Sequence, residues 1–128
     1  MTTLITEDVQ ARVAEAAACG ELIVQRCGSC GRWVWFPRTV CPHCFEDTLE
    51  WNTASGSGTV ITFSIVHKPQ QPAYLTHVPI VFALVLLDEG CEMATTLMGD
   101  DRTSVAIGDR VRLAPDGWSR LPQFRLER

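Results

Sequence analysis

Two short stretches decide the fold: Cys27-Gly28-Ser29-Cys30-Gly31 and Cys41-Pro42-His43-Cys44. Each C-x-x-C pair forms a tight turn that directs two sulfurs at one centre, and glycine permits the positive φ that such turns need. Two turns of this kind supply four sulfurs in a tetrahedron, which is the closed geometry of a structural zinc site. We therefore predict that a structural Zn²⁺ is held by Cys27, Cys30, Cys41 and Cys44.

The predicted site has no open coordination position, so the zinc is expected to be structural rather than catalytic. Rubredoxin-type iron and a metal-free pair of dithiols are the alternatives that the spacing leaves open. His43 is expected to be an outward-facing surface residue, and Cys19 and Cys91 are expected to be small core residues. No base or oxyanion hole lies beside Cys91 in the sequence, so no catalytic residue is assigned.

A short helix is predicted from Thr6 to Cys19, before the cysteine region. Thr6 is a suitable N-cap, and Val9, Val13 and Ala17 recur at helical spacing. Gly20 is a natural stop at the C-terminal end. Three turns are marginally stable alone in water, so the helix must pack either on its own chain or on a partner subunit.

The remainder of the chain, after the turn-forming cluster 52–58, reads as all-β. In the strand expected at 59–66, residues Ile61, Phe63 and Ile65 alternate onto one face. Further strands are expected at 80–87, 91–98, 110–113 and 122–126. Five short strands suit a small Greek-key barrel of the OB type. The predicted fold is mainly β, divided into a helical segment at 1–21, a zinc ribbon at 22–51 and an OB-fold domain at 52–128.

Composition limits the kinds of partner that the chain can bind and the cellular compartment in which it is expected. The 128 residues carry 11 Lys and Arg against 15 Asp and Glu, a net charge of −4, whereas nucleic-acid binding requires a cationic surface. The longest apolar run, residues 80–87, is too short to span a bilayer. The first eight residues lack the pattern of a signal peptide, so a cytoplasmic location and metal-bound rather than disulfide-bonded cysteines are expected.

The chain resembles a known family along almost its whole length. The resemblance is carried by Gly20-Glu21-Leu22, Pro37-Arg38, the two cysteine pairs, Trp51, Ser55-Gly56-Ser57-Gly58-Thr59-Val60 and Leu121-Pro122-Gln123-Phe124. It is similar to proteins that join a rubredoxin-like zinc ribbon to an acyl-CoA-associated OB-fold domain, long classed as a domain of unknown function. The resemblance implies a companion of thiolase-fold enzymes, of acyl-CoA hydratases or of the thiolase-like aldolases that shorten steroid side chains.

The leading functional hypothesis is therefore a non-catalytic accessory subunit of an acyl-CoA-processing enzyme. The resemblance implies that it stabilises the partner in a hetero-oligomer and helps to form the CoA-thioester site, with the chemistry in the partner. A nucleic-acid-binding protein is the runner-up, because zinc ribbons and OB barrels also do that work. An iron-containing electron carrier and a free-standing enzyme are further alternatives. The aromatic stretch Trp33-Val34-Trp35-Phe36 is either an interface anchor or the core of the ribbon.

Overall fold

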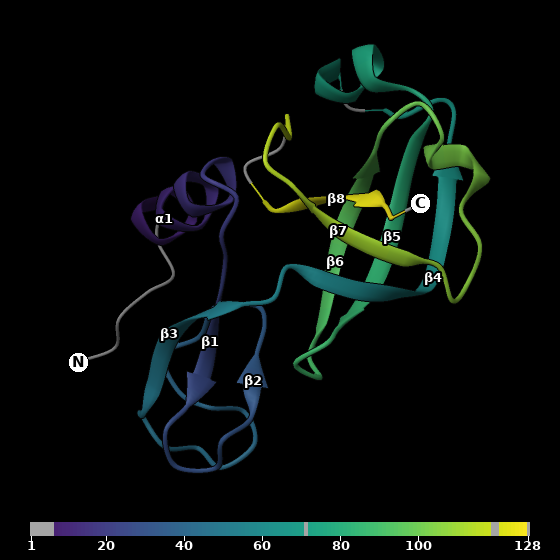
Figure 1. Ribbon diagram of the computed structural model, residues 1–128. Helices are drawn as coiled ribbons and strands as arrows, with labels where there is room; N and C mark the ends of the chain where they lie inside the picture. Colours follow the sequence, from purple (N-terminus) through teal and green to yellow (C-terminus); the bar gives the residue numbers. More distant parts are fainter. Residues whose placement is uncertain (1–6, 71, 119–120, 128) are drawn as a thin grey trace.

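Two β-sheets and one α-helix form the part of the chain that the computed structural model describes, residues 7–70, 72–118 and 121–127. The first sheet has the strand order β2-β1-β3, and the second is a closed barrel of order β4-β5-β6-β8-β7 (Figure 1). The elements are α1 Glu7–Ala18, β1 Leu22–Cys27, β2 Trp33–Val34, β3 Leu49–Ala54, β4 Ser57–Val66, η1 Pro72–His77, β5 Ile80–Leu87, β6 Glu92–Met98, η2 Arg102–Ser104, β7 Arg110–Ala114 and β8 Gln123–Leu126, where η marks a 3₁₀ helix. The predicted mainly β fold, with a helix, a ribbon and a five-stranded barrel, is confirmed.

Helix α1 ends as its sequence predicts, while its expected N-cap, Thr6, lies outside the described residues. Gly20 adopts a φ of +83°, and its N–H donates to the carbonyl of Ala17 at 3.0 Å. The N–H of Glu21 donates to the carbonyl of Ala16 at 2.9 Å, which completes a Schellman cap. The helix packs against β1 and β7. It is therefore docked on both sheets of its own chain, the first of the two predicted modes of packing.

The ribbon sheet is built around β1, which pairs antiparallel with β2 on one side and β3 on the other. The β1–β3 register runs from Leu22 opposite Ala54 to Cys27 opposite Leu49. Cys27, the first of the candidate metal ligands, therefore lies at the end of a strand that is paired along its whole length with β3. This pairing fixes the position of the first cysteine turn relative to the start of β3.

A buried amide secures the loop that leads to the second cysteine turn. Gln25 on β1 is only 7% exposed. Its Nε2 donates to the carbonyl of Arg38 at 2.9 Å, and its Oε1 accepts from the N–H of Arg38 at 2.7 Å. Both polar groups of the amide are thus satisfied by one backbone residue, which holds the loop against the sheet.

The barrel closes through β4, which pairs with β5 along its length and with β7 at its first residues. The β4–β5 register shifts between Val60 and Thr62, as in a β-bulge. Val60 is buried at 1% exposure, whereas Ile61 is 37% exposed. The prediction that Ile61 lies on one face with Phe63 and Ile65 is therefore wrong, because the bulge adds one residue to β4 and interrupts the alternation at Ile61.

One hydrophobic core connects the helix, the base of the ribbon and the barrel. It contains Ala17 of α1, Leu22 of β1 and the fully buried Phe124 of β8. Trp33 and Trp35 are partly buried and pack against this core. The two tryptophans therefore support the interpretation of the aromatic stretch as ribbon core. A second, smaller core lies under the cysteine turns and consists of Cys27, Val34 and Cys41.

The two cysteines outside the ribbon differ in their environments. Cys91 is buried as predicted, and burial raises the pKa of its thiol to about 11. Cys19 is exposed, so its prediction as a core residue is wrong. Cys19 follows the last residue of α1 and lies in the capping turn at Gly20, beyond the helical face that packs on the sheets.

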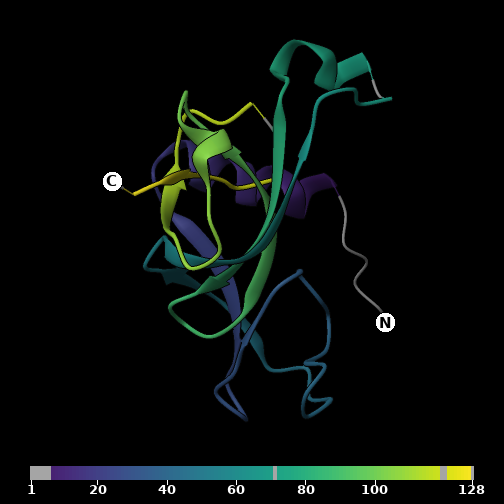
Figure 2. The same cartoon turned by 90° about the vertical axis from the view of Figure 1, so that its right-hand side faces the viewer.

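The cysteine turns of the ribbon and the 3₁₀ helix η1 lie at opposite ends of the molecule, and two perpendicular views agree on this (Figures 1 and 2). The ribbon loops project away from the barrel in both views. Within the described residues, none of the helices has the length and apolar character needed to cross a membrane.

Candidate metal centre

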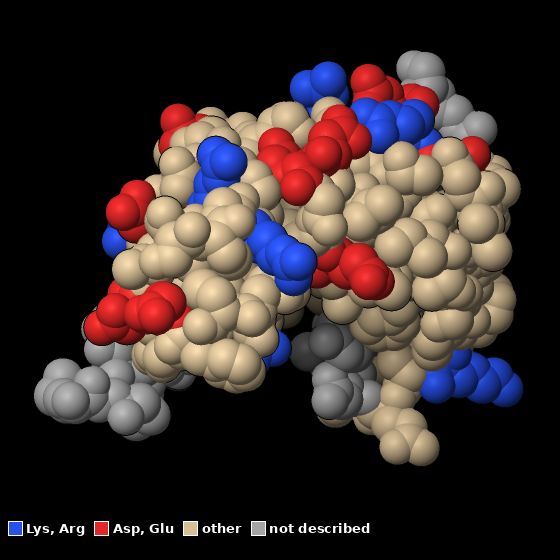
Figure 3. All heavy atoms as spheres, turned by 90° about the horizontal axis from the view of Figure 1, so that it is seen from below, with Lys and Arg blue, Asp and Glu red and all other residues tan. Residues whose placement is uncertain are grey.

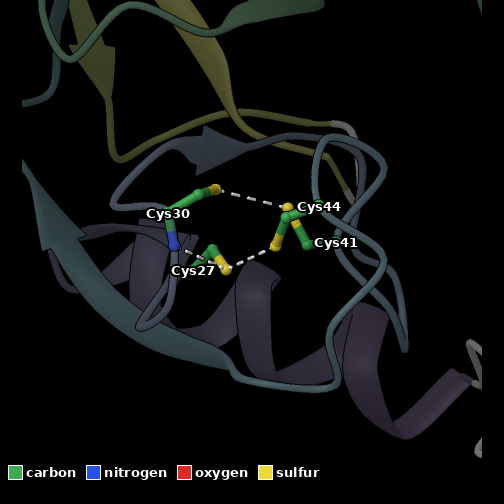
Figure 4. A group of neighbouring side chains, drawn as sticks. All are labelled: Cys27, Cys30, Cys41 and Cys44. Carbon is green, nitrogen blue, oxygen red and sulfur yellow. Dashed lines mark hydrogen bonds between the residues drawn. The ribbon is translucent and has the colours of Figure 1, made fainter.

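The four predicted ligands converge on one point. Figure 4 shows two cysteines from each turn with their side chains directed toward one another. All four Sγ atoms lie within 4.8 Å of one another. The Sγ atoms of Cys27 and Cys44 are 3.5 Å apart, and those of Cys30 and Cys41 are 3.7 Å apart. Two sulfurs come from the end of β1 and two from the loop before β3, so the pairing of these strands brings them together.

The two cysteine turns have matching backbone geometry. The N–H of Gly31 donates to the carbonyl of Cys27 at 2.9 Å, and the N–H of Phe45 donates to that of Cys41 at 2.8 Å. Each turn also directs a backbone N–H at its first sulfur: Cys30 N–H at Cys27 Sγ and His43 N–H at Cys41 Sγ, both at 3.4 Å. Such donors spread the negative charge of the thiolates, which lowers their mutual repulsion.

Hydrogen bonds, burial and the neighbouring sulfurs together drive the thiol pKa values apart. A hydrogen bond from Thr48, assisted by the N–H of Cys30, lowers the pKa of Cys27 to about 6. The N–H of Glu46 lowers the pKa of Cys44, but burial and the neighbouring sulfurs outweigh it and raise that pKa to about 12. Four sulfurs this close cannot all be thiolates without a compensating cation, and a divalent metal supplies that charge.

The donor set and its spacing fit zinc. A Zn–S bond of about 2.3 Å in a tetrahedron places neighbouring sulfurs about 3.8 Å apart. The two sulfur pairs at 3.5 and 3.7 Å are close to that value. Four soft sulfur donors select zinc or iron over magnesium and calcium. Because Cys27 and Cys41 are buried, they would place the ion under the ribbon surface.

Two hydroxyl groups also serve the site, one from Ser29 in the first cysteine turn and one from Thr48 outside both turns. Thr48 Oγ1 lies 3.3 Å from Cys27 Sγ and 2.9 Å from Ser29 Oγ. If Ser29 donates to Thr48, the hydroxyl proton of Thr48 is directed at the sulfur. Sequence reasoning assigned no role to either residue. Thr48 follows Cys44 by four positions and belongs to neither turn, and Ser29 was considered only as part of the first turn. The signal lies in the β1–β3 register, which places Leu49 opposite Cys27.

A Thr48→Val variant is expected to release zinc to a colorimetric chelator about ten times faster than the wild type, since lost outer-shell partners typically weaken metal binding by 10- to 100-fold. Valine keeps the shape of the side chain but donates no hydrogen bond to Cys27. Thr48→Ser retains the hydroxyl and serves as the control. Equal release rates for Thr48→Val and the wild type would contradict this role.

His43 is an exposed residue, as predicted, and its ring contacts an arginine. Its Nδ1 lies 3.1 Å from Nη1 of Arg32, which belongs to the segment after the first turn. This contact joins the two cysteine turns across the surface of the ribbon. His43 therefore braces the ribbon from outside and does not belong to the sulfur cluster.

The fold and the sulfur cluster define a class of protein in which a structural zinc ribbon is joined to an OB-fold barrel. Residues 14–50 match the family described as the rubredoxin-like zinc ribbon domain of ChsH2, and residues 51–115 match its C-terminal OB-fold domain. The chain belongs to this ChsH2 family, also known as DUF35. The family resemblance drawn from the sequence is thereby confirmed.

Relatives of the chain carry names from acyl-CoA metabolism and from scaffolding. A probable enoyl-CoA hydratase alpha subunit of Thermomonospora curvata is 37% identical over 116 residues, which cover 87% of this chain and 35% of that protein. The chain thus spans about a third of that relative. A DUF35 domain-containing scaffold protein of Methanocaldococcus jannaschii is 35% identical over 75% of this chain and 72% of its own length.

Solved structures agree with this family assignment. A chain of the structure titled Ltp2-ChsH2(DUF35) aldolase superposes with a TM-score of 0.71 and 34% sequence identity, covering 91% of this chain and 93% of that one. A DUF35 protein from Sulfolobus solfataricus superposes with a TM-score of 0.64 at 17% identity, which extends the likeness of fold. The arrangement of ribbon and barrel is therefore common to family members of widely different sequence.

Proposed function

We propose that the chain is a non-catalytic accessory subunit of an acyl-CoA-processing enzyme, whose partner is a thiolase-like, aldolase or hydratase subunit. The observation that carries the proposal is the likeness to the chain in the Ltp2-ChsH2(DUF35) aldolase structure, which covers nine-tenths of both chains. Relatives named as a scaffold protein and as a hydratase alpha subunit support the same role. The division at residues 21/22 and 51/52 into helical segment, ribbon and barrel belongs to this proposal.

The zinc in this proposal is ligated by Cys27, Cys30, Cys41 and Cys44. With four protein sulfurs on the metal, no position is left for water or for a thioester carbonyl, so the ion holds the ribbon together and takes no part in turnover. The chemistry accordingly lies in the partner subunit. This chain contributes a binding surface and structural support to the partner subunit.

A groove on the barrel supports a contribution to the CoA-thioester site. It has a volume of about 490 Å³ and is lined by residues of β4, β5 and β6 together with Leu121 and Pro122. Its walls are mostly apolar, with Phe82 and Leu84 on β5 and the hydroxyls of Thr62 and Ser64 on β4. An apolar groove with a few polar groups suits the acyl part of a thioester better than its phosphates.

The nucleic-acid alternative has less support. Each arginine of β7 and β8 forms an ion pair with a carboxylate. The pairs are Arg110 with Asp88, Arg112 with Glu127 and Arg125 with Asp116. On the face of the molecule in Figure 3, acidic and basic side chains are interspersed and form no continuous basic stripe. Phosphate binding needs cationic groups that are free to displace counterions.

Affinity capture from the native host tests the proposal. The tagged chain is expected to retain an enzyme of the thiolase, aldolase or hydratase class, identified by mass spectrometry. The identified partner, purified with and without this chain, is then assayed on acyl-CoA substrates. We expect turnover by the pair and a large loss of activity or solubility in the partner alone.

Two results would overturn the accessory role. One is turnover of an acyl-CoA by this chain alone, and the other is its recovery only as a solitary monomer. Binding to DNA or RNA that weakens steeply with salt would favour the nucleic-acid alternative instead.

A further inference from the structure

The two cysteine turns have matching backbone hydrogen bonds, but they differ in the residue that adopts a positive φ. The residue after the second cysteine is Gly31 in the first turn and Phe45 in the second. Both adopt left-handed backbone angles, with φ of +77° and +64°. Glycine is the ordinary residue at such a position because it lacks the Cβ that would crowd the backbone. Phe45 is the only non-glycine with a positive φ among the described residues.

The side chain of Phe45 gains little from the fold of the free chain. It is 78% exposed, the largest exposed fraction among the exposed large hydrophobic residues that the structure describes. Bulky residues at positive φ are rare because the conformation is strained, and strained residues cluster where function requires them. A phenylalanine at this position is disfavoured by the backbone conformation and gains little from burial. We therefore expect its role to lie in a contact with another molecule.

Two further apolar residues of the same loop are exposed. Val40 is 39% exposed and Pro42 is exposed, and the N–H of Cys41 between them donates to the carbonyl of Glu46 at 2.9 Å. We call Val40, Pro42 and Phe45 the knuckle patch. The ribbon loops that carry it project from the molecule at the end opposite η1 (Figures 1 and 2). The knuckle patch is thus placed for contact with a second macromolecule.

The charges beside the knuckle patch indicate what kind of surface it can bind. Glu46 and Asp47 follow Phe45 directly, both are exposed, and neither forms an ion pair with another described residue. Two basic residues belong to the same region: Arg32, which contacts His43, and Arg38, which is exposed two positions before Val40. Neither forms an ion pair with Glu46 or Asp47 in the described part of the chain. An apolar centre beside two unpaired carboxylates fits an apolar pocket with basic side chains at its edge.

We infer that the knuckle patch docks in a basic-edged apolar pocket of the enzyme partner, with Phe45 as the anchoring side chain. The inference rests on the proposed function, since it assigns the surface by which the accessory subunit holds its enzyme. Aromatic anchors dominate the binding energy of such interfaces, while the surrounding contacts mainly exclude water. The zinc then has a second effect, because it holds the turn that presents the ring.

A Phe45→Gly variant separates binding from stability. Purified partner, identified by capture with the wild-type chain, is titrated against the wild type, Phe45→Gly and Ile107→Ala. Phe45→Gly is expected to bind at least about thirty-fold more weakly, the loss typical of an interface hot spot. It should retain its zinc and melt no lower than the wild type, because glycine adopts the positive φ without strain. Ile107, 69% exposed on the barrel, gives the matched control with unchanged affinity.

Each other outcome overturns the inference in a distinguishable way. If the wild type binds an acyl-CoA enzyme and Phe45→Gly binds within about three-fold of it, the knuckle patch is not the anchor, while the accessory role stands. If Phe45→Gly melts several degrees lower, the ring is part of the ribbon's own packing. If the wild type self-associates and the variant does not, the occupant is a second copy. If the wild type binds no such enzyme, the proposed function fails as well.

Discussion

A Cys41→Ser variant is expected to lose the zinc ion and to aggregate during purification. Cys41 is fully buried and forms, with Cys27 and Val34, the small core beneath the cysteine turns. So small a core cannot hold the loops in place, and the metal has to supply most of the stability. Structural zinc contributes roughly 10–16 kcal/mol in small zinc fingers. That is as large as the whole net stability of most domains, about 5–15 kcal/mol, so a three-sulfur site should leave the ribbon unfolded.

Zinc content and melting temperature check this expectation. The wild type should carry one zinc per chain by elemental analysis, and Cys41→Ser should carry almost none. Cys19→Ser is the matched control, because Cys19 is exposed and lies outside the sulfur cluster. A metal-free Cys41→Ser chain with an unchanged melting curve would show that the sulfurs are not the basis of ribbon stability.

The clustering of the four cysteines could be predicted from sequence because the geometry of each turn is local. Each C-x-x-C pair places two sulfurs within one turn, and Gly31 supplies the positive φ that this turn requires. The end of the helix at Gly20 was predictable for the same reason, since a Schellman cap involves only the last helical turn. A few adjacent residues thus determine each cysteine turn and the helix cap, while the meeting of the two turns depends on the pairing of β1 with β3.

The features that sequence reasoning missed depend on contacts between distant segments. Thr48 reaches Cys27 only through the antiparallel register of β1 and β3, which no local pattern in the sequence specifies. Ile61 is exposed because a bulge interrupts the alternation of β4, and strict alternation was the basis for placing it on one face with Phe63 and Ile65. Phe45 was overlooked because an exposed aromatic becomes informative only once its backbone angle is known.

The junction motif Ser55-Gly56-Ser57-Gly58-Thr59-Val60 contributed to the family resemblance, and the structure gives a physical reason for its second glycine. Gly58 pairs with Leu87 on β5 and with Val111 on β7. It lies at the position where β4 is bonded to both of its barrel neighbours. A Cβ built on Gly58 would lie 2.5 Å from Cγ1 of Val85 and 2.7 Å from the carbonyl oxygen of Leu86. Glycine is therefore required there by close packing rather than by turn formation.

Gly58→Ala is accordingly expected to destabilise the barrel by about 3 kcal/mol, the upper part of the usual range for overpacking a core. The clash with the Leu86 oxygen cannot be relieved by a side-chain rotation, because that carbonyl belongs to the backbone of β5. For a chain of this size the loss corresponds to a melting temperature lower by about 10 °C. Zinc content should stay at one ion per chain, since the substitution lies outside the ribbon.

Gly28→Ala provides the matched comparison for this loss. Gly28 also lacks a positive φ, but an added Cβ would come no closer than 3.5 Å to the nearest atom, the carbonyl oxygen of Thr48. We expect Gly28→Ala to melt within about 2 °C of the wild type, as a substitution without steric conflict should. Differential scanning calorimetry of the two variants tests the steric role of Gly58. Similar melting temperatures would mean that β4 and β5 can move apart at Gly58 at little cost in stability. In that case the glycine at the junction would need an explanation other than the close approach of the two strands.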